Sequence, residues 1–336
     1  SRRYDVATSR CEAPMPAQEI QASSSDESAE PAFAEQPAPP VEPRTVVDAA
    51  ELPVPAAPGT ARRLSNGVIE IEVSSTGGSI SSAVMSAYPS SMEENSGPVV
   101  LDFGGINLLG LEGLPGLSFD TAFSLTENAD ASALTLEARN QQGLRLTRTL
   151  RFEDDYLVQV TDHFVNESDT ALRVPSAKLR LGKMELSADQ YRVRGMQYLG
   201  VDSLSPGGEK VKHWGKKALS MLKGSSGPVV TELVGRPVDW LAVKNKYFVQ
   251  SVRPESGGDD GVVRFWRKGD EREPDAVAGQ IVFPEFSLDP DGSFSREMHV
   301  YIGPKKYTDL KRIGFHRTTS WSWAGRRRSV VSCSTA

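Results

Sequence analysis

The chain has 336 residues, of which 38% are hydrophobic and 24% are charged, and its formal net charge is −6. This acidic balance argues against a nucleic-acid-binding protein, which needs a basic face to displace counterions. No stretch approaches the roughly 20 consecutive apolar residues that span a bilayer. The length allows one large domain or two domains of ordinary size.

Residues 1 to 60 are rich in Pro, Ala, Glu and Ser. Such a segment buries too little apolar surface to offset the entropy lost on ordering, so we predict a disordered, extended linker. The chain starts at Ser1 without a Met, and we expect this start to be a cut and not a natural terminus.

From residue 62 the pattern changes to short strands and turns. Apolar residues alternate with glutamates from Ile69 to Val73, and Gly77-Gly78 then supplies a turn before a second strand from Ile80 to Tyr88. This pattern predicts a half-exposed antiparallel hairpin. Residues 89–118 are rich in turn residues around one short predicted strand from Val99 to Phe103.

Regular alternation resumes in the next part of the chain. It predicts strands at residues 134–138, 144–152 and 156–164, with turns at Asp154-Asp155 and at residues 166–169. Another strand is predicted from Leu172 to Leu181, and a turn at residues 206–208.

The most basic stretch of the chain lies between residues 210 and 223. Its lysines are Lys210, Lys212, Lys216, Lys217 and Lys223. Residues 212–223 fit either a basic loop or a short helix with Trp214 on its apolar side. The lysines are either a solvated face or a contact surface for a partner or for lipid headgroups.

Three further strands are predicted at Trp240–Val252, Val262–Trp266 and Val277–Phe283. The glycine-rich turn at residues 257–261 indicates a hairpin between the first two. A last strand from Met298 to Ile302 ends at Gly303-Pro304, where Pro304 suits the first turn of a helix over about residues 304–314. Leu310 falls on the apolar face of that helix, and Lys305 and Lys306 are expected to point to water.

Many regular strands with few helical stretches predict an all-β fold. We expect residues 62 to 303 to form one large, twisted antiparallel β-sandwich, closed by a short C-terminal helix.

Two short motifs carry a resemblance to a known family. The first is Asp239-Trp-Leu-Ala-Val-Lys-Asn-Lys-Tyr-Phe248, and the second is Tyr301-Ile-Gly-Pro-Lys305 with a Leu a few residues later. Together with Arg63-Leu-Ser-Asn-Gly67 and Gly77-Gly78, they make residues 62–315 resemble the periplasmic domain of YidC-type membrane protein insertases. The residues that match the family motifs are Trp240, Ala242, Lys246, Tyr247, Phe248, Tyr301, Gly303, Pro304, Lys305 and Leu310.

The resemblance implies a function without catalysis. The family domain lies in the periplasm of bacteria as part of an inner-membrane insertase, and its implied partners are Sec translocon subunits and nascent inner-membrane proteins. The implied fold is a super-sandwich similar to galactose mutarotase. The insertase's membrane helices would flank this segment, and the chain is expected to be truncated before them.

No catalytic, metal or cofactor motif stands out, and we expect neither a metal nor a cofactor. The four histidines lack metal-ligand spacing. The rival hypothesis is a mutarotase-like enzyme, which would pair His163 or His299 with Glu285 or Glu297 for proton transfer. A polysaccharide-binding module is a third possibility. Fold does not carry function, and no motif places these groups together.

The tail at residues 316–336 is rich in Arg and Ser and has no period. Two explanations stay open: a natural variable tail, or a frameshifted continuation. A shifted frame that starts in the Arg317 codon can read Asp-Asp-Val-Met-Glu-Leu-Gly-Trp, which restores the Gly-Trp that the family has before its membrane helices.

Overall fold

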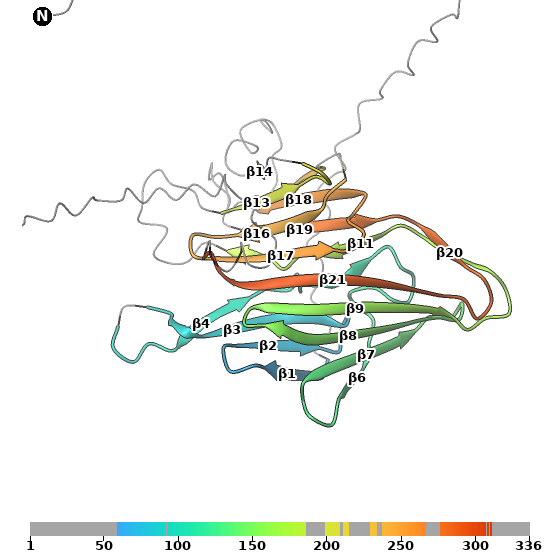
Figure 1. The fold of residues 1–336 in the computed structure, drawn as a ribbon, viewed down its shortest axis with the longest axis horizontal. Coiled ribbons are helices and arrows are strands. Elements are labelled where there is room, and N and C mark those ends of the chain that lie inside the picture. Colours follow the sequence, from blue (N-terminus) through green and yellow to red (C-terminus); the bar gives the residue numbers. More distant parts are fainter. Residues whose placement is uncertain are drawn as a thin grey trace, which may run out of the picture. The chain divides into compact units, whose positions relative to one another are not determined.

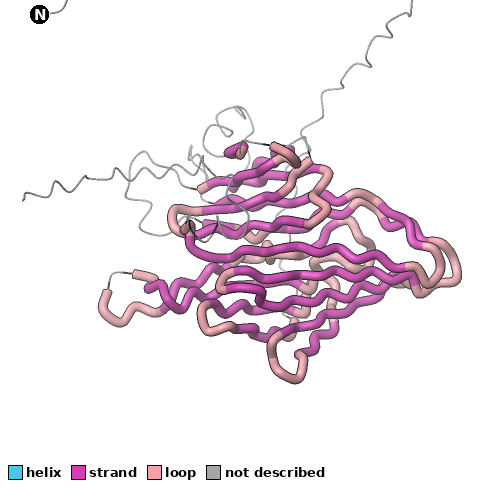
Figure 2. Tube along the Cα trace, viewed as in Figure 1, coloured by secondary structure: helices cyan, strands magenta, loops and turns pink. Residues whose placement is uncertain are grey.

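The computed structural model describes residues 59–91, 93–185, 199–208, 211–214, 229–233, 237–266, 276–306, 308 and 310. Nearly all regular structure in this part of the chain is β-strand (Figure 2). The predicted linker at residues 1–60, except for its last two residues, and the tail at residues 316–336 lie outside the described residues. Here no helix is long and apolar enough to cross a membrane.

One sheet has nine strands (Figure 1). In order across the sheet they are β14 (Lys212–Trp214), β13 (Gly200–Leu204), β16 (Trp240–Lys244), β17 (Phe248–Pro254), β21 (Ser293–Pro304), β9 (Leu157–Asn166), β8 (Leu144–Asp154), β7 (Ala133–Arg139) and β6 (Ser124–Glu127).

Three smaller sheets complete the described strands. The first has the order β1 (Ala61–Ser65), β2 (Ile69–Ser74), β3 (Ser79–Pro89) and β4 (Pro98–Asp102). The second has the order β15 (Val229–Leu233), β18 (Asp260–Trp266), β19 (Ala276–Phe283), β11 (Ala177–Arg180) and β5 (Leu111–Glu112), with β12 (Met184–Glu185) also paired to β19. The third pairs β10 (Leu172–Val174) with β20 (Phe286–Leu288).

The sheets share one apolar core. It contains alternate residues of β2 and β3, of β11 and β19, and of the nine-stranded sheet. At Gly279 on β19, a methyl group would lie 2.8 Å from Leu241 Cδ2 on β16, so these two sheets are in direct contact. All strand pairs in the described part are antiparallel, which confirms the predicted all-β antiparallel sandwich.

A buried ion pair anchors two loops to the nine-stranded sheet. Arg148 on β8 and Asp162 on β9 are fully buried and form a bidentate pair, with N–O distances of 2.6 and 2.7 Å. Arg148 Nη1 also donates to the carbonyl oxygens of Gly78 and Leu109, at 2.8 and 2.6 Å. Because each charge has a hydrogen-bonded partner, the cost of burying it is offset.

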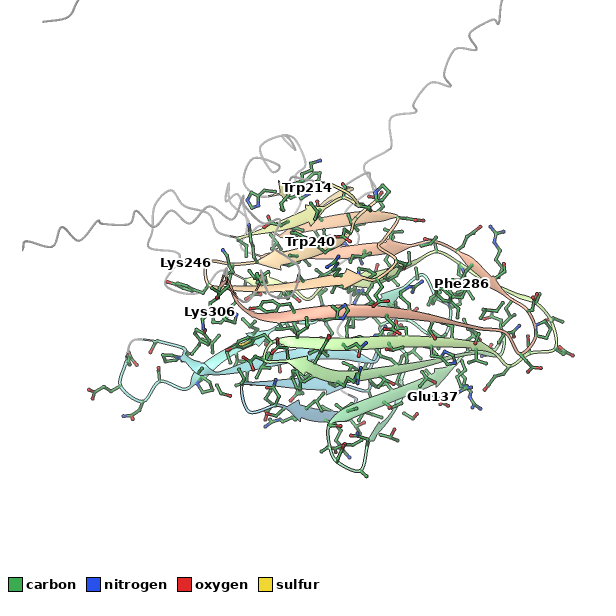
Figure 3. All side chains as sticks on the ribbon, in the orientation of Figure 1. Glu137, Trp214, Trp240, Lys246, Phe286 and Lys306 are labelled. Carbon is green, nitrogen blue, oxygen red and sulfur yellow. The ribbon has the colours of Figure 1, made fainter. Side chains whose placement is uncertain are left out.

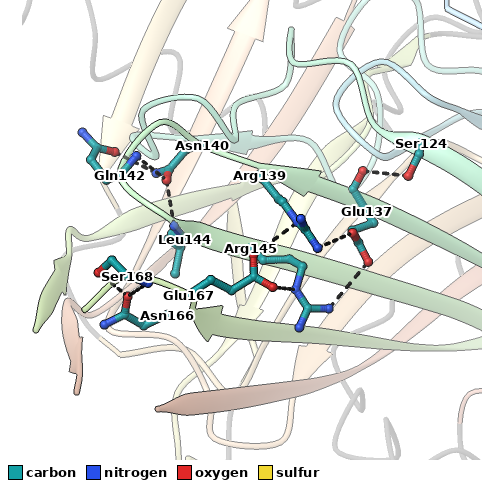
Figure 4. Close-up of polar contacts among 10 residues, drawn as sticks. All are labelled: Ser124, Glu137, Arg139, Asn140, Gln142, Leu144, Arg145, Asn166, Glu167 and Ser168. Carbon is teal, nitrogen blue, oxygen red and sulfur yellow. Dashed lines mark hydrogen bonds and ion pairs between the residues drawn. The ribbon is translucent and has the colours of Figure 1, made fainter. Parts of the chain in front are cut away.

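A second ion network lies at the end of β7, β8 and β9 (Figure 4). Arg145 lies 2.6 Å from Glu167 and 3.6 Å from Glu137. Arg139 lies 3.3 Å from Glu167 and 3.5 Å from Glu137. These side chains are partly exposed, so solvent screening leaves each pair worth little.

Local periodicity located several strands correctly. The alternation at 69–73 becomes β2, which pairs with β3 as the predicted hairpin. The predicted strands at 134–138, 144–152 and 156–164 become β7, β8 and β9, and the turn at Asp154-Asp155 joins the last two.

Two predicted strands are wrong because each is in fact two strands. The segment Trp240–Val252 folds back on itself as β16 and β17, with residues 245–247 as the turn. The segment Leu172–Leu181 breaks at Pro175, which has no N–H for a strand ladder. Its two halves, β10 and β11, pair with different strands in different sheets.

The predicted hairpin around residues 257–261 is also wrong. β17 pairs with β16 and β21, whereas β18 pairs with β15 and β19. The glycine-rich turn therefore carries the chain from the nine-stranded sheet to the six-stranded sheet. Sequence reasoning also missed β13 and β15, which are short and have no clear alternation.

The C-terminal element differs from the prediction at its start. β21 continues to Pro304, the last residue of its ladder with β17, and Pro304 therefore lies in a strand and not in a helix. Thr308 and Leu310 are helical, and the Leu310 N–H donates to Lys306 O at 3.1 Å. Leu310 is buried, as its predicted apolar position requires. The predicted helix beyond residue 310 lies outside the described residues.

Candidate functional site

The two family-like motifs are neighbours in the nine-stranded sheet, although residues 249–300 separate them in the chain. β17 and β21 pair with Phe248 opposite Pro304 and Val249 opposite Gly303. The Lys305 N–H then donates to Tyr247 O at 2.8 Å. Two segments that sequence reasoning treated separately therefore form one structural unit at one end of this sheet.

Asn245 shapes the turn between β16 and β17. Its side-chain Oδ1 accepts hydrogen bonds from the Tyr247 and Phe248 N–H groups, at 3.0 and 2.9 Å. Its own N–H donates to Phe248 O at 3.0 Å. This side-chain capping of a tight turn is typical of Asn. It leaves the Tyr247 side chain 43% exposed at the tip.

The apolar motif residues support the unit from inside. Trp240 and Ala242 on β16 are each 1% exposed, so they belong to the core. Tyr301 is buried as well, and its hydroxyl donates to Pro304 O at 2.7 Å. This hydrogen bond fixes the point at which the chain leaves the sheet.

Gly303 is required by close packing. A methyl group at this position would lie 2.7 Å from Cγ and 2.9 Å from Cβ of Tyr156. Tyr156 lies just before β9, which pairs with β21 on the side opposite β17. The ring of Tyr156 also makes an edge contact with the ring of Tyr301, at 6.1 Å between centroids. Only a residue without a side chain lets the ring of Tyr156 cover the strand here.

A charged cluster lies beside the motif unit. Asp202 on β13 is 1% exposed and receives hydrogen bonds from Lys244 Nζ and His213 Nδ1, both at 2.5 Å. Burial acts to raise the pKa of Asp202, but the His213 hydrogen bond and the Lys244 charge outweigh it. The pKa therefore lies below the ordinary value of a carboxyl group.

Lys305 extends this cluster to the exit segment. Its Nζ donates to Asn245 O at 3.0 Å, so it ties the residues after β21 to the β16–β17 turn. Burial and then the nearby Lys244 charge lower the pKa of Lys305 to about 8. The expectation that Lys305 points to water is wrong, because its side chain is half-buried against the turn.

Sequence reasoning missed Asp202, Lys244 and His213 as members of one cluster. They come from β13, β16 and β14, whose order in the sheet is set by long-range pairing. In the sequence, Asp202 stands beside apolar residues, which was the available hint of burial. Nothing in the sequence identified its partners.

The predicted lysine patch is described only in part. Lys212 lies in β14, so this residue is in a strand and not in a loop or helix. Its Nζ lies 3.7 Å from the ring centroid of Trp214. Lys210, Lys216, Lys217 and Lys223 lie outside the described residues, and the patch as a whole stays a prediction.

Each His and Glu side chain of the mutarotase hypothesis contacts a residue outside the proposed pairs. His163 Nδ1 lies 2.8 Å from Ser295 Oγ, and His299 Nε2 lies 3.2 Å from Glu153. Glu285 pairs instead with Arg173 at 2.6 Å, and Glu297 accepts a hydrogen bond from the Gln159 side chain at 3.3 Å. Within the described ranges, no three His, Cys, Asp or Glu side chains gather as metal ligands.

A protein-family model for the YidC periplasmic domain matches residues 62–326. Two curated relatives, both called membrane protein insertase YidC and from two Coxiella burnetii strains, are 22% identical over 275 residues. These matches cover 76% of this chain and 46% of each relative, so the chain spans about half the length of these relatives.

Similar solved structures include two Lactobacillus proteins. One is a galactose mutarotase related enzyme from Lactobacillus acidophilus, with 11% identity and a TM-score of 0.46 over 72% of this chain and 97% of that chain. The other is a galactose mutarotase-like protein from Lactobacillus casei, with 12% identity and a TM-score of 0.46 over 72% of this chain and 100% of that chain.

Proposed function

The chain belongs to the YidC periplasmic domain family, and we propose that it is the periplasmic module of a membrane protein insertase in the bacterial inner membrane. The observation that carries this proposal is the family match over residues 62–326, which includes both motifs. The pairing of those motifs supports it, because their residues build one interlocked unit at the point where the chain leaves the sandwich.

We propose further that the module has no catalytic activity and assists the insertion and folding of inner-membrane proteins together with the Sec translocon. Its tightly packed motif residues serve structure: Trp240 fills the core, Gly303 admits Tyr156, and Tyr301 holds the exit of the strand. Such a unit suits a rigid docking platform more than a reaction centre.

Two surfaces are suited to partner contacts. β6 is the last described strand on its side of the nine-stranded sheet, and Ser124, Thr126 and Glu127 on it are exposed. An edge strand can pair with an extended chain, so β6 is the candidate contact for nascent proteins. At the other side of the sheet, Lys212 on β14 offers positive charge to an acidic partner such as a translocon subunit.

The test uses the full-length insertase in living cells. A photo-crosslinking amino acid is placed at Thr126 or at Lys212, and at Lys178 as a control, since Lys178 is exposed but lies on β11 within another sheet. We expect Thr126 to crosslink to a nascent membrane protein and Lys212 to a Sec subunit, with neither product from Lys178. Equal labelling at all three positions would reject both contacts.

A second measurement separates the proposal from the mutarotase hypothesis. Polarimetry of freshly dissolved α-D-glucose is expected to show no acceleration by the purified chain. Acceleration that is lost on replacing His163 or His299 would favour the enzyme instead.

A further inference from the structure

Lysines and tyrosines gather at the end of the nine-stranded sheet where the two motifs meet. We name this the lysine–tyrosine surface and define it as Tyr88, Lys246, Tyr247, Lys305 and Lys306. Lys246 Nζ lies 4.5 Å from the ring centroid of Tyr247, and Lys306 Nζ lies 5.6 Å from that of Tyr88. Lys246 and Lys306 lie at the same end of the sheet in Figure 3.

The surface is firmly built. The ring of Tyr88 makes an edge contact with buried Phe248, at 5.6 Å between centroids. The Lys305 N–H and Nζ bind the backbone of residues 247 and 245, which fixes the exit segment to the turn. The side chains of Tyr247 and Lys306 remain exposed. The turn and the exit segment therefore hold the lysines and the aromatic rings close together, which lowers the ordering cost of binding.

The charged residues of the lysine–tyrosine surface as defined above are three lysines, whereas the chain as a whole has a net charge of −6. The buried carboxylate of this region, Asp202, is already compensated by Lys244 and His213. Asp155 is an acidic group near this surface, since both it and Lys306 act on the hydroxyl of Tyr156. At an ionic strength of about 0.1 M, charges more than about 10 Å away are screened, so nearby lysines decide what this surface attracts.

We infer that the lysine–tyrosine surface rests on the anionic phospholipid headgroups of the membrane. Lysine ammonium groups bind headgroup phosphates, while their aliphatic stems and the tyrosine rings suit the boundary between water and lipid. The surface adjoins the exit segment of a module whose relatives are called membrane protein insertases. This inference rests on the proposed function in one respect, which is that the module lies beside a membrane.

The test measures binding of the purified 336-residue chain to vesicles by co-sedimentation. Vesicles of phosphatidylcholine alone are compared with vesicles of phosphatidylcholine mixed with phosphatidylglycerol. We expect binding to the mixed vesicles only, and weaker binding at higher salt. The variant K246Q/K306Q should lose affinity by about fivefold per lysine, which corresponds to about 1 kcal/mol each.

The matched control is R62Q/K178Q, which removes the same charge from exposed positions on β1 and β11. It should bind as the unmodified chain does. Tyr247→Ser tests the ring separately and should weaken binding without changing the salt dependence. Circular dichroism confirms that each variant is folded.

Two results would overturn the inference. One is that the unmodified chain fails to bind the mixed vesicles. This result is also expected if the surface binds an acidic protein and not lipid. The other is an equal loss in the control, which would mean that only total charge matters. Vesicle binding is measured without any insertion assay. The chain can therefore fail to bind vesicles while the proposed insertase function stands, and it can bind vesicles even if the proposed insertase function is wrong.

Discussion

Gly303→Ala provides a sharp test of how the motif unit is packed. The added methyl group would lie 2.7 Å from Tyr156 Cγ, well inside normal contact distance. Cγ and Cβ are close to the Tyr156 backbone, so the clash cannot be relieved by moving the far end of a flexible side chain. Because β21 is held between β17 and β9, its backbone cannot shift freely either. Overpacking of this kind costs about 2–3 kcal/mol.

Urea unfolding followed by tryptophan fluorescence would measure this cost, and a double-mutant cycle would identify its cause. Tyr156→Ala alone should destabilise the domain by about 3–5 kcal/mol, because a large buried side chain is lost. In the Tyr156→Ala background, Gly303→Ala should cost less than about 0.5 kcal/mol, since its clashing partner has gone.

Gly97→Ala is the control for the glycine substitution. No atom lies within 4 Å of a methyl group placed there, and the change should leave stability within about 0.5 kcal/mol of the unmodified protein. If Gly303→Ala behaved like Gly97→Ala, or if its cost persisted without the Tyr156 ring, overlap with Tyr156 would not be the reason for glycine at position 303.

Three other substitutions test the charged groups. Asp162→Asn leaves buried Arg148 without its counter-ion and should lower the free energy of unfolding by about 3–5 kcal/mol in the same urea assay. The pKa of Lys305 is about 8 in the folded state, against an ordinary value of 10.5. Between these two pH values the unfolded state binds more protons than the folded state, so the free energy of unfolding should rise with pH across that window. Lys305→Met should remove this rise in the free energy of unfolding, which amounts to up to about 3 kcal/mol. If the pH profile of the variant were unchanged, the rise would come from another titrating group. Glu167→Gln removes the exposed partner of Arg145 and should lower the free energy of unfolding by less than about 1 kcal/mol, and by still less in high salt. A large loss that does not depend on salt would show that this ion pair is not screened by solvent.

Much of the strand content could be read from local patterns. In β2, β8 and β9, apolar and polar residues alternate because one face packs into the core, and buried positions recur at every second residue over most of each strand. Arg148, Asp162 and Asn166 break the rule of residue type, because they are polar and yet lie at buried positions. The turn at Asp154-Asp155 was equally local. The two motifs were identified from their residues and from their order and spacing along the chain.

Strand partners could not be read in the same way. Alternation is the same whether a strand continues, turns back or crosses to another sheet, so the turn at residues 245–247 and the crossing near residue 257 were both misjudged. Both depend on which strand offers a complementary ladder, and that strand lies far away in the sequence.

The candidate site shows the same division. Residue types within each motif indicated a strand end and a turn, but the reason for Gly303 lies in Tyr156, which is 147 positions earlier in the numbering. The contacts of Asp202 with Lys244 and His213 likewise exist only because β13 lies between β14 and β16. Short-range periodicity fixes which face of a strand is buried, whereas only the packed sheet determines which side chains meet on that face.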